Sequence, residues 1–152
     1  VIRAVAHALA FAHDRGVIHR DIKPDNVFFG DGDRVLLGDF GIAFGLHHEH
    51  LTIKGEALGT PAYMAPEQLE DAPVTTAADI YSLALLAYEM LGGRAPWAGE
   101  SLWSIVHKQK TAELPDVESV LKRIRNSEYA TQLRRCLSKE PLQRPQTGSE
   151  LL

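Results

Sequence analysis

The fold is decided by VIHRDIKPDN at residues 17–26, followed by DFG at residues 39–41. Both stretches place ionisable and metal-binding side chains between short apolar runs. The first contains an HRD triplet ending at Asp21, and four residues separate it from Asn26, which fits H-R-D-x-x-x-x-N. A polar loop with capping Asp and Asn side chains would explain either stretch alone. The two stretches together, in this order along the chain, favour a functional site with acid–base and metal-binding groups.

Together the two stretches resemble the catalytic loop and the metal-binding loop of protein kinases. The resemblance implies phosphoryl transfer from ATP, which needs an oriented hydroxyl and neutralised phosphate charge. It implies that Asp21 accepts the proton of the substrate hydroxyl or orients it, and that Lys23 places positive charge near the transferring phosphate. Asn26 and Asp39 would offer oxygen atoms to Mg²⁺ or Mn²⁺, because hard cations prefer oxygen ligands. Lys23, Asn26 and Asp39 are thus implied contacts of ATP, while His19 is expected to be structural.

Residues 1–10 repeat apolar side chains every three to four positions, which predicts an amphipathic helix with one apolar stripe. Gly16 is a natural C-terminal stop for it. In kinases a helix of this kind leads into the catalytic loop. The pattern begins at the first residue with no capping residue before it, so we expect the chain to be a piece of a longer domain.

Residues 27–29 and 35–37 predict two short strands. The sequence GDGD at residues 30–33 has the composition of a tight hairpin turn between them. The kinase resemblance places Phe28 on the floor of the adenine pocket, where the family usually has a smaller aliphatic residue.

The activation segment, by the same resemblance, covers residues 39–67. Phe40 is expected to be structural, and Gly41 would let the chain turn sharply beside the metal, since glycine tolerates positive φ. Residues 47–50, HHEH, suggest a metal site, but H-E-x-x-H fails here. A solvated, mobile loop is the favoured interpretation of this stretch.

Two residues suggest regulation. Thr52 precedes Thr60 by eight residues and resembles an activation-loop threonine of bacterial receptor-type kinases. An unmodified surface threonine explains it equally well. If Thr52 is phosphorylated, Arg20 is the expected partner of the phosphate, through charge-assisted hydrogen bonds.

A third motif, GTPAYMAPE at residues 59–67, closely resembles the G-T-x-x-Y-M-A-P-E segment of serine/threonine kinases. The resemblance implies that Thr60 shapes the acceptor site and that Lys23 and Thr60 favour Ser/Thr over Tyr acceptors. Glu67 needs a partner if it is buried. Arg144, in EPLQRP, matches the distant arginine that pairs with this glutamate in the family.

Residues 76–91 are apolar on nearly all sides, which predicts a helix buried in the middle of the domain. A capping box is expected at Thr76, with Asp79 in the place of Glu, and Gly92-Gly93 should end the helix. Asp79 also matches the family's buried aspartate that braces the catalytic loop, a role that one side chain can combine with the cap.

The rest of the chain predicts further helices. They are a short helix capped by Ser101, an apolar stripe over residues 117–124, a helix over residues 129–137 and the start of one at residues 147–152.

Composition is that of one globular domain of 152 residues, with 45% hydrophobic and 24% charged residues. The net charge of −4 argues against nucleic acid as a partner. Cys136 is the single cysteine and cannot form an internal disulfide, which favours a reducing, cytoplasmic location and a core-packing role. No apolar run is long enough to cross a membrane.

We therefore expect a mainly α fold with a small β-hairpin, corresponding to the large C-terminal lobe of a kinase over residues 1–152. The N-terminal lobe is absent from this sequence, since no G-x-G-x-x-G loop or V-A-I-K lysine occurs. Joined to that lobe, the domain should transfer phosphate from ATP to Ser/Thr residues of protein substrates, and alone it should be inactive. The alternative is a standalone, non-catalytic binding or decoy module.

Overall fold

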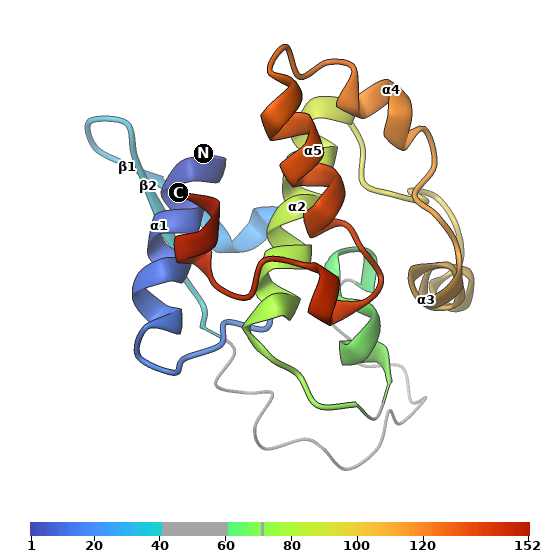
Figure 1. Cartoon of the computed structure of the whole chain (residues 1–152), viewed down its shortest axis with the longest axis horizontal. Helices are drawn as coiled ribbons and strands as arrows, with labels where there is room; N and C mark the ends of the chain where they lie inside the picture. The colour runs from blue at the N-terminus through green and yellow to red at the C-terminus, as the bar shows by residue number, and fades with distance from the viewer. Residues whose placement is uncertain (41–60, 71) are drawn as a thin grey trace.

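The computed structural model describes residues 1–40, 61–70 and 72–152. Its regular elements are mostly helices, with one antiparallel two-stranded sheet, as the sequence predicts (Figure 1). In chain order they are α1 (Ile2–His13), β1 (Val27–Gly30), β2 (Arg34–Leu37), α2 (Thr76–Gly92), α3 (Leu102–Thr111), α4 (Val117–Leu121) and α5 (Ser127–Cys136). No helix among the described residues is both long and apolar enough to cross a bilayer.

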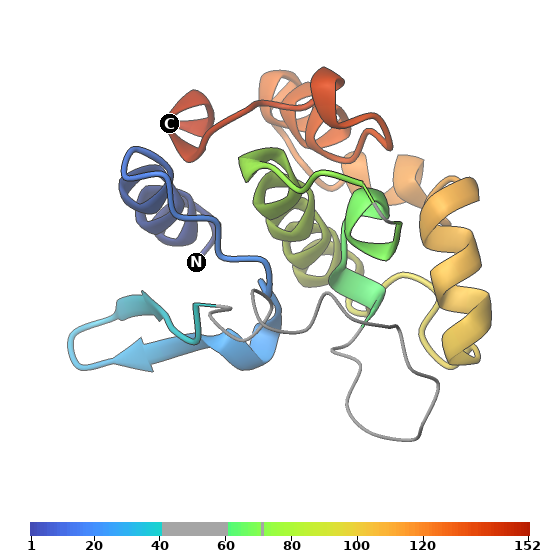
Figure 2. The same ribbon diagram turned by 90° about the horizontal axis from the view of Figure 1, so that it is seen from below.

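Helix α2 lies in the centre of the molecule, with α1 and the hairpin on one side and α3, α4 and α5 on the other (Figures 1 and 2). Every residue from Ala77 to Tyr88 is buried, which confirms the prediction from its all-round apolar sequence. Gly93 ends the helix in the left-handed conformation, with φ of 84°.

The start of α2 differs from the prediction. The N-cap is Thr75, whose side chain accepts a hydrogen bond from Ala77 N–H, whereas Thr76 donates its hydroxyl to the carbonyl of Gln146. Asp79 takes no part in capping, because its carboxylate faces another segment of the chain. The predicted capping box at Thr76 is therefore wrong.

Two apolar clusters share α2. On one side Leu83 and Leu86 pack with Val5 and Leu9 of α1 and with Ile22. On the other side, residues of α2 pack with the segments that follow it, in a cluster that includes Ile80, Tyr81, Leu85, Val120, Cys136 and Leu137. The buried stripe of α1 agrees with its predicted periodicity. Burial raises the pKa of the Cys136 thiol to about 11, as expected for a core-packing cysteine.

The hairpin has the predicted strands, with Val27 paired to Leu37 at its base and Gly30 to Arg34 at the turn. Helix α1 ends at His13, before the predicted stop. Gly16 follows in a turn with φ of 71°, where its N–H donates to the carbonyl of His13.

The later helices follow the predicted pattern with different bounds: α3 extends to Thr111, and α5 begins at Ser127. Ser101 caps α3, accepting from Ser104 N–H at 3.3 Å, and α5 covers most of the predicted range. Helix α4 ends at Leu121, so Ile124 lies beyond it. The helix expected from Thr147 is a 3₁₀ turn, Gly148–Leu151, that lies against α1 (Figure 1).

Gly148 makes the contact with α1 possible. A Cβ atom on it would lie 2.4 Å from the backbone nitrogen of Ala10 and 2.7 Å from the carbonyl oxygen of Ala6. Both neighbours are helical backbone atoms, which cannot move aside as a flexible side chain can. Only glycine therefore allows the C-terminal turn to approach α1 this closely.

We predict that Gly148→Ala lowers the free energy of unfolding by about 3 kcal/mol, the upper part of the range for overpacking. Urea denaturation followed by circular dichroism measures the change. Gly30→Ala is the control, because a Cβ there meets its nearest atom, in Leu36, at 3.6 Å, an ordinary contact. Equal stability of the two variants would contradict this account of the α1 contact.

Candidate active site

The loop that follows α1 is held by one carboxylate from α2. Asp79 accepts the backbone N–H of His19 at 2.8 Å with Oδ2 and that of Arg20 at 2.8 Å with Oδ1. Its side chain is almost completely buried. Arg20 has φ of 68°, a strained conformation for a non-glycine residue. The two bonds to Asp79 hold the loop in that conformation.

His13 completes the environment of Asp79. Its Nε2 lies 2.9 Å from Asp79 Oδ2, and its Nδ1 accepts the backbone N–H of Gly148 at 3.1 Å. Because Nδ1 accepts, the ring proton required for the bond to Asp79 lies on Nε2. Sequence reasoning missed this residue, since a single histidine near the end of an apolar helix has no local signal for such a role.

Asp21, Lys23 and Asn26 form one cluster. Asn26 donates its amide N–H groups to the carbonyl of Asp21 at 2.7 Å and to its Oδ2 at 3.0 Å. Lys23 Nζ lies 2.9 Å from the same Oδ2, with about a fifth of its side chain exposed. These contacts leave Asp21 Oδ1 and Asn26 Oδ1 without a donor among the described residues.

The metal-loop residues adjoin this cluster through Gly38. Its N–H donates to the carbonyl of Asn26 at 3.0 Å, and its carbonyl accepts from His19 Nε2 at 2.9 Å. His19 Nδ1 accepts the N–H of Asp21 at 3.3 Å, so the proton of the ring is on Nε2. The Phe40 ring lies against His19, with 4.5 Å between centroids. Asp39 is thus bounded on both sides by residues that contact the catalytic loop.

Asp39 is exposed and has φ of 54°, the left-handed region. Phe28 borders the same place, because a Cβ on Gly38 would lie 2.7 Å from its ring. Phe28 is 46% exposed. An exposed carboxylate, that of Asp39, and a half-exposed aromatic ring, that of Phe28, therefore both adjoin Gly38.

Gln68 connects the end of the GTPAYMAPE stretch at residues 59–67, the acceptor motif, to the loop of residues 17–26, the catalytic loop. Its Oε1 accepts from Ala65 N–H at 3.0 Å, and its Nε2 donates to the carbonyl of Arg20 at 2.8 Å. Both backbone polar groups of Arg20 are thus bonded: its N–H donates to Asp79, and its carbonyl accepts from Gln68. Sequence reasoning did not single out Gln68, although it directly follows Glu67 of the APE motif.

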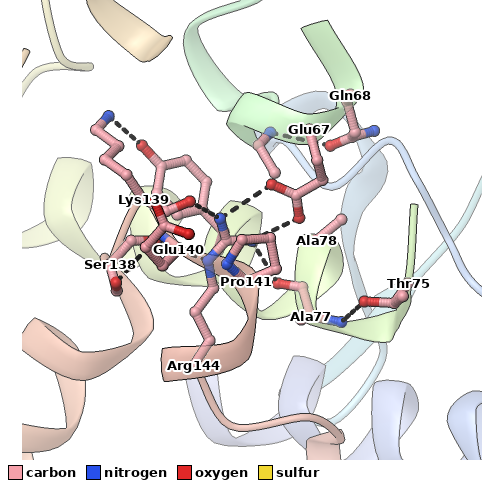
Figure 3. Close-up of polar contacts among 12 residues, drawn as sticks. Glu67, Gln68, Thr75, Ala77, Ala78, Ser138, Lys139, Glu140, Pro141 and Arg144 are labelled. Carbon is pink, nitrogen blue, oxygen red and sulfur yellow. Dashed lines mark hydrogen bonds and ion pairs between the residues drawn. The ribbon is translucent and has the colours of Figure 1, made fainter. Parts of the chain in front are cut away.

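Glu67 and Arg144 form a buried, bidentate ion pair (Figure 3). The Nη1–Oε1 distance is 2.6 Å and the Nη2–Oε2 distance is 3.0 Å. The remaining guanidinium N–H groups donate to the carbonyls of Ser138, Ala77 and Lys139 at 2.7, 3.1 and 2.8 Å. All five donors of the guanidinium are used. The pair therefore joins the end of the acceptor motif to α2 and to the segment after α5.

Several predicted site residues lie outside the described residues. They are Gly41, residues 47–50, Thr52 and Thr60. Within the ranges that the structure describes, no group of three or more His, Cys, Asp or Glu side chains is arranged to hold a metal ion. The two predicted metal ligands, Asn26 and Asp39, are joined through Gly38 as described above.

The family described as "Protein kinase domain" has a model that matches residues 1–151 of this chain. The serine/threonine-protein kinase PknL of Mycobacterium tuberculosis is 39% identical over 121 residues, which are 80% of this chain and 30% of that protein. The kinase PkaA of Streptomyces coelicolor is 40% identical over 144 residues, 93% of this chain and 26% of that protein. A probable serine/threonine-protein kinase of Clostridium acetobutylicum is 35% identical over 97% of this chain and 22% of its own length. The chain thus spans less than a third of these relatives.

We predict that Arg144→Met lowers the free energy of unfolding by about 3–5 kcal/mol, because it leaves the Glu67 carboxylate buried without its partner. Thermal and urea unfolding measure the loss. Arg134→Met is the matched control, since Arg134 forms an ion pair with Glu118 at 2.6 Å on the exposed surface, where such pairs contribute little. A small effect of Arg144→Met, similar to that of the control, would show that the buried pair is not a stabilising link.

Proposed function

Because the chain belongs to the protein kinase domain family, we propose that it provides the acceptor and metal-binding half of a serine/threonine protein kinase. In this proposal the complete protein transfers phosphate from ATP to Ser or Thr side chains of protein substrates. The observation that carries the proposal is the cluster of Asp21, Lys23 and Asn26 on a loop held by Asp79. A module that only binds has no chemical need for that set.

Asp21 orients the acceptor hydroxyl in this mechanism. Its Oδ2 is occupied by Asn26 and Lys23, so Oδ1 is the atom that would accept the hydrogen bond of a substrate hydroxyl. Both neighbours donate to the carboxylate, which fixes its orientation in the site. The carboxylate is partly exposed, with 24% of the side chain accessible, so a protein substrate can reach it.

Lys23 supplies positive charge to the same site. Its ammonium is held beside Asp21 at 2.9 Å, so it would lie near a phosphate that is transferred to the oriented hydroxyl. Electrostatic stabilisation by a positioned cation is the main contribution that a protein makes to phosphoryl transfer. Lys23 and Thr60 together favour Ser/Thr over Tyr acceptors in this proposal.

Asn26 and Asp39 fit the requirements of a magnesium site. The amide N–H groups of Asn26 are used by Asp21, so its oxygen is directed to other partners, and the Asp39 carboxylate is open. An amide oxygen and a carboxylate are ligands suited to Mg²⁺ or Mn²⁺. When bound with ATP, the metal neutralises phosphate charge. Phe28, at 46% exposure, would offer its ring to the adenine.

The missing lobe is the proposed partner of the hairpin face. Phe28 and its cross-strand partner Leu36 are 46% and 51% exposed on one face of the hairpin and would be covered by a second lobe that grips ATP. Without that lobe much of the nucleotide would stay in water, whereas binding sites usually bury most of their ligand. We therefore propose that this chain alone transfers no phosphate. We place the reaction in the cytoplasm, consistent with the buried, unpaired Cys136.

We also propose that Arg20 is the docking partner of a phosphate on Thr52. The backbone of Arg20 is fixed by Asp79 and Gln68, so its side chain starts from a defined position beside Asp21. A phosphate paired with it would be linked directly to the catalytic loop.

We predict that Asp21→Asn and Asp39→Asn in the complete protein each reduce phosphate transfer on the order of 10³-fold, because one removes the acceptor-orienting carboxylate and the other a metal ligand. Transfer of radiolabelled phosphate from ATP and Mg²⁺ to a protein acceptor measures the loss. Asp31→Asn, in the exposed hairpin turn, is the control and should retain activity.

Near-normal transfer by either site variant would contradict the assignment. No transfer by the unmodified complete protein, together with saturable binding of a protein partner, would instead support the non-catalytic module.

A further inference from the structure

The acceptor segment, Pro61–Tyr63, begins the described part of the GTPAYMAPE motif. It is held by side chains from two helices in addition to its own backbone bond, from Met64 N–H to the Pro61 carbonyl at 3.2 Å. Gln109 of α3 donates from Nε2 to the carbonyl of Ala62 at 3.0 Å and to that of Pro61 at 3.3 Å. Ser82 of α2 donates its hydroxyl to the carbonyl of Tyr63 at 2.7 Å. Three consecutive carbonyl groups are thus fixed by two side chains from two helices.

Gln109 is especially important at Ala62. A continuing 3₁₀ turn would pair the Ala62 carbonyl with the N–H of Ala65, but that N–H donates to Gln68 Oε1 instead. Gln109 is therefore the donor that the described residues provide to this carbonyl. Its side chain has no exposed surface. Loss of its amide would leave a buried carbonyl without a partner, which is unfavourable.

The oxygen atom of the Gln109 amide also has two partners. Gln109 Oε1 accepts from the Tyr81 hydroxyl at 2.9 Å and from Lys139 Nζ at 3.4 Å. Two carbonyls face Nε2 and two donors face Oε1, so the amide cannot rotate by 180° without losing its bonds. The orientation that serves Pro61 and Ala62 is thus imposed by Tyr81 and Lys139.

Lys139 is itself held in place. Its ammonium also donates to the Tyr81 hydroxyl at 2.7 Å and to the backbone carbonyl of Gln109 at 2.8 Å. No carboxylate forms an ion pair with it among the described residues. Burial, together with the nearby charge of Arg144, lowers its pKa to about 8. The group remains mostly charged at neutral pH and keeps its hydrogen atoms directed at these acceptors.

We propose that Gln109, oriented by Tyr81 and Lys139, is a positioning residue that fixes the acceptor segment and so controls the binding of the protein substrate. The inference rests on the proposed kinase function and adds to it a residue outside the sequence motifs. In the described residues Gln109 contacts the acceptor segment but not Asp21, Asn26 or Asp39. Its loss should therefore weaken the protein acceptor and spare ATP.

The test uses the complete kinase with myelin basic protein as the acceptor and measures kcat and KM for both substrates. Gln109→Met keeps the length of the side chain but removes its hydrogen bonds. We expect KM for the acceptor to rise about tenfold, as for a modest misplacement of a binding segment, while KM for ATP stays within about twofold. Gln132→Met, at a half-buried position of α5 outside this network, is the matched control and should change neither constant.

Gln109→Glu tests whether hydrogen-bond donation by the Gln109 amide, and not only the packing of its side chain, is required. Glutamate retains acceptors for Tyr81 and Lys139 but cannot donate to the carbonyls of Pro61 and Ala62. It should raise KM for the acceptor as Gln109→Met does. Normal KM for the acceptor with Gln109→Glu would overturn the proposal.

Tyr81→Phe is a milder variant in case Gln109 substitutions prevent folding. It removes one donor to Oε1 and should raise KM for the acceptor by a few fold with ATP binding unchanged. An effect on both KM values alike, or on the unfolding temperature alone, would overturn the positioning role while the kinase function stands. Absence of transfer by the unmodified kinase would overturn the proposed function, and this inference with it.

Discussion

A single buried carboxylate determines the shape of the catalytic loop. Asp79 accepts two successive backbone N–H groups, those of His19 and Arg20, and a ring N–H from His13. A buried carboxylate is tolerated only when such donors replace water. The arrangement directs Asp79 of α2 to the loop, so this carboxylate is not used in a capping box, and Thr75 rather than the predicted Thr76 caps the helix. The demands of the loop thus override the local preference for a capping box.

A second set of buried polar contacts, around Arg144, links separate segments of the chain. Glu67 neutralises the guanidinium, and backbone carbonyls satisfy its remaining donors. Lys139 lies in the same region without a carboxylate partner among the described residues, and its lowered pKa reflects this environment. Both cations also lie near the Tyr81 ring, at 4.7 Å for Arg144 and 5.3 Å for Lys139. Tyr81 therefore connects the ion pair to Gln109 and the acceptor segment, and burial raises the pKa of its own hydroxyl.

The fold was largely predictable from the sequence, whereas the polar links between its parts were not. The all-round apolar pattern of residues 76–91 identified the central helix, and GDGD identified the hairpin turn. Gln68, Gln109 and His13 went unnoticed, because an uncharged polar side chain finds a partner through tertiary contacts that leave no periodic signal.

The site is consequently a product of the whole fold. Arg20 and Asp39 have φ of 68° and 54°, conformations that neither residue favours in an isolated chain. Arg20 is held by Asp79 and Gln68, from segments about 50 to 60 residues away in sequence. Asp39 lies between Gly38 and Phe40, both of which contact the catalytic loop. Local sequence cannot maintain such strain, so the motif residues acquire their geometry only when α1, α2 and the C-terminal turn pack together. Loss of packing at Gly148 should therefore reach the catalytic loop through His13 and Asp79.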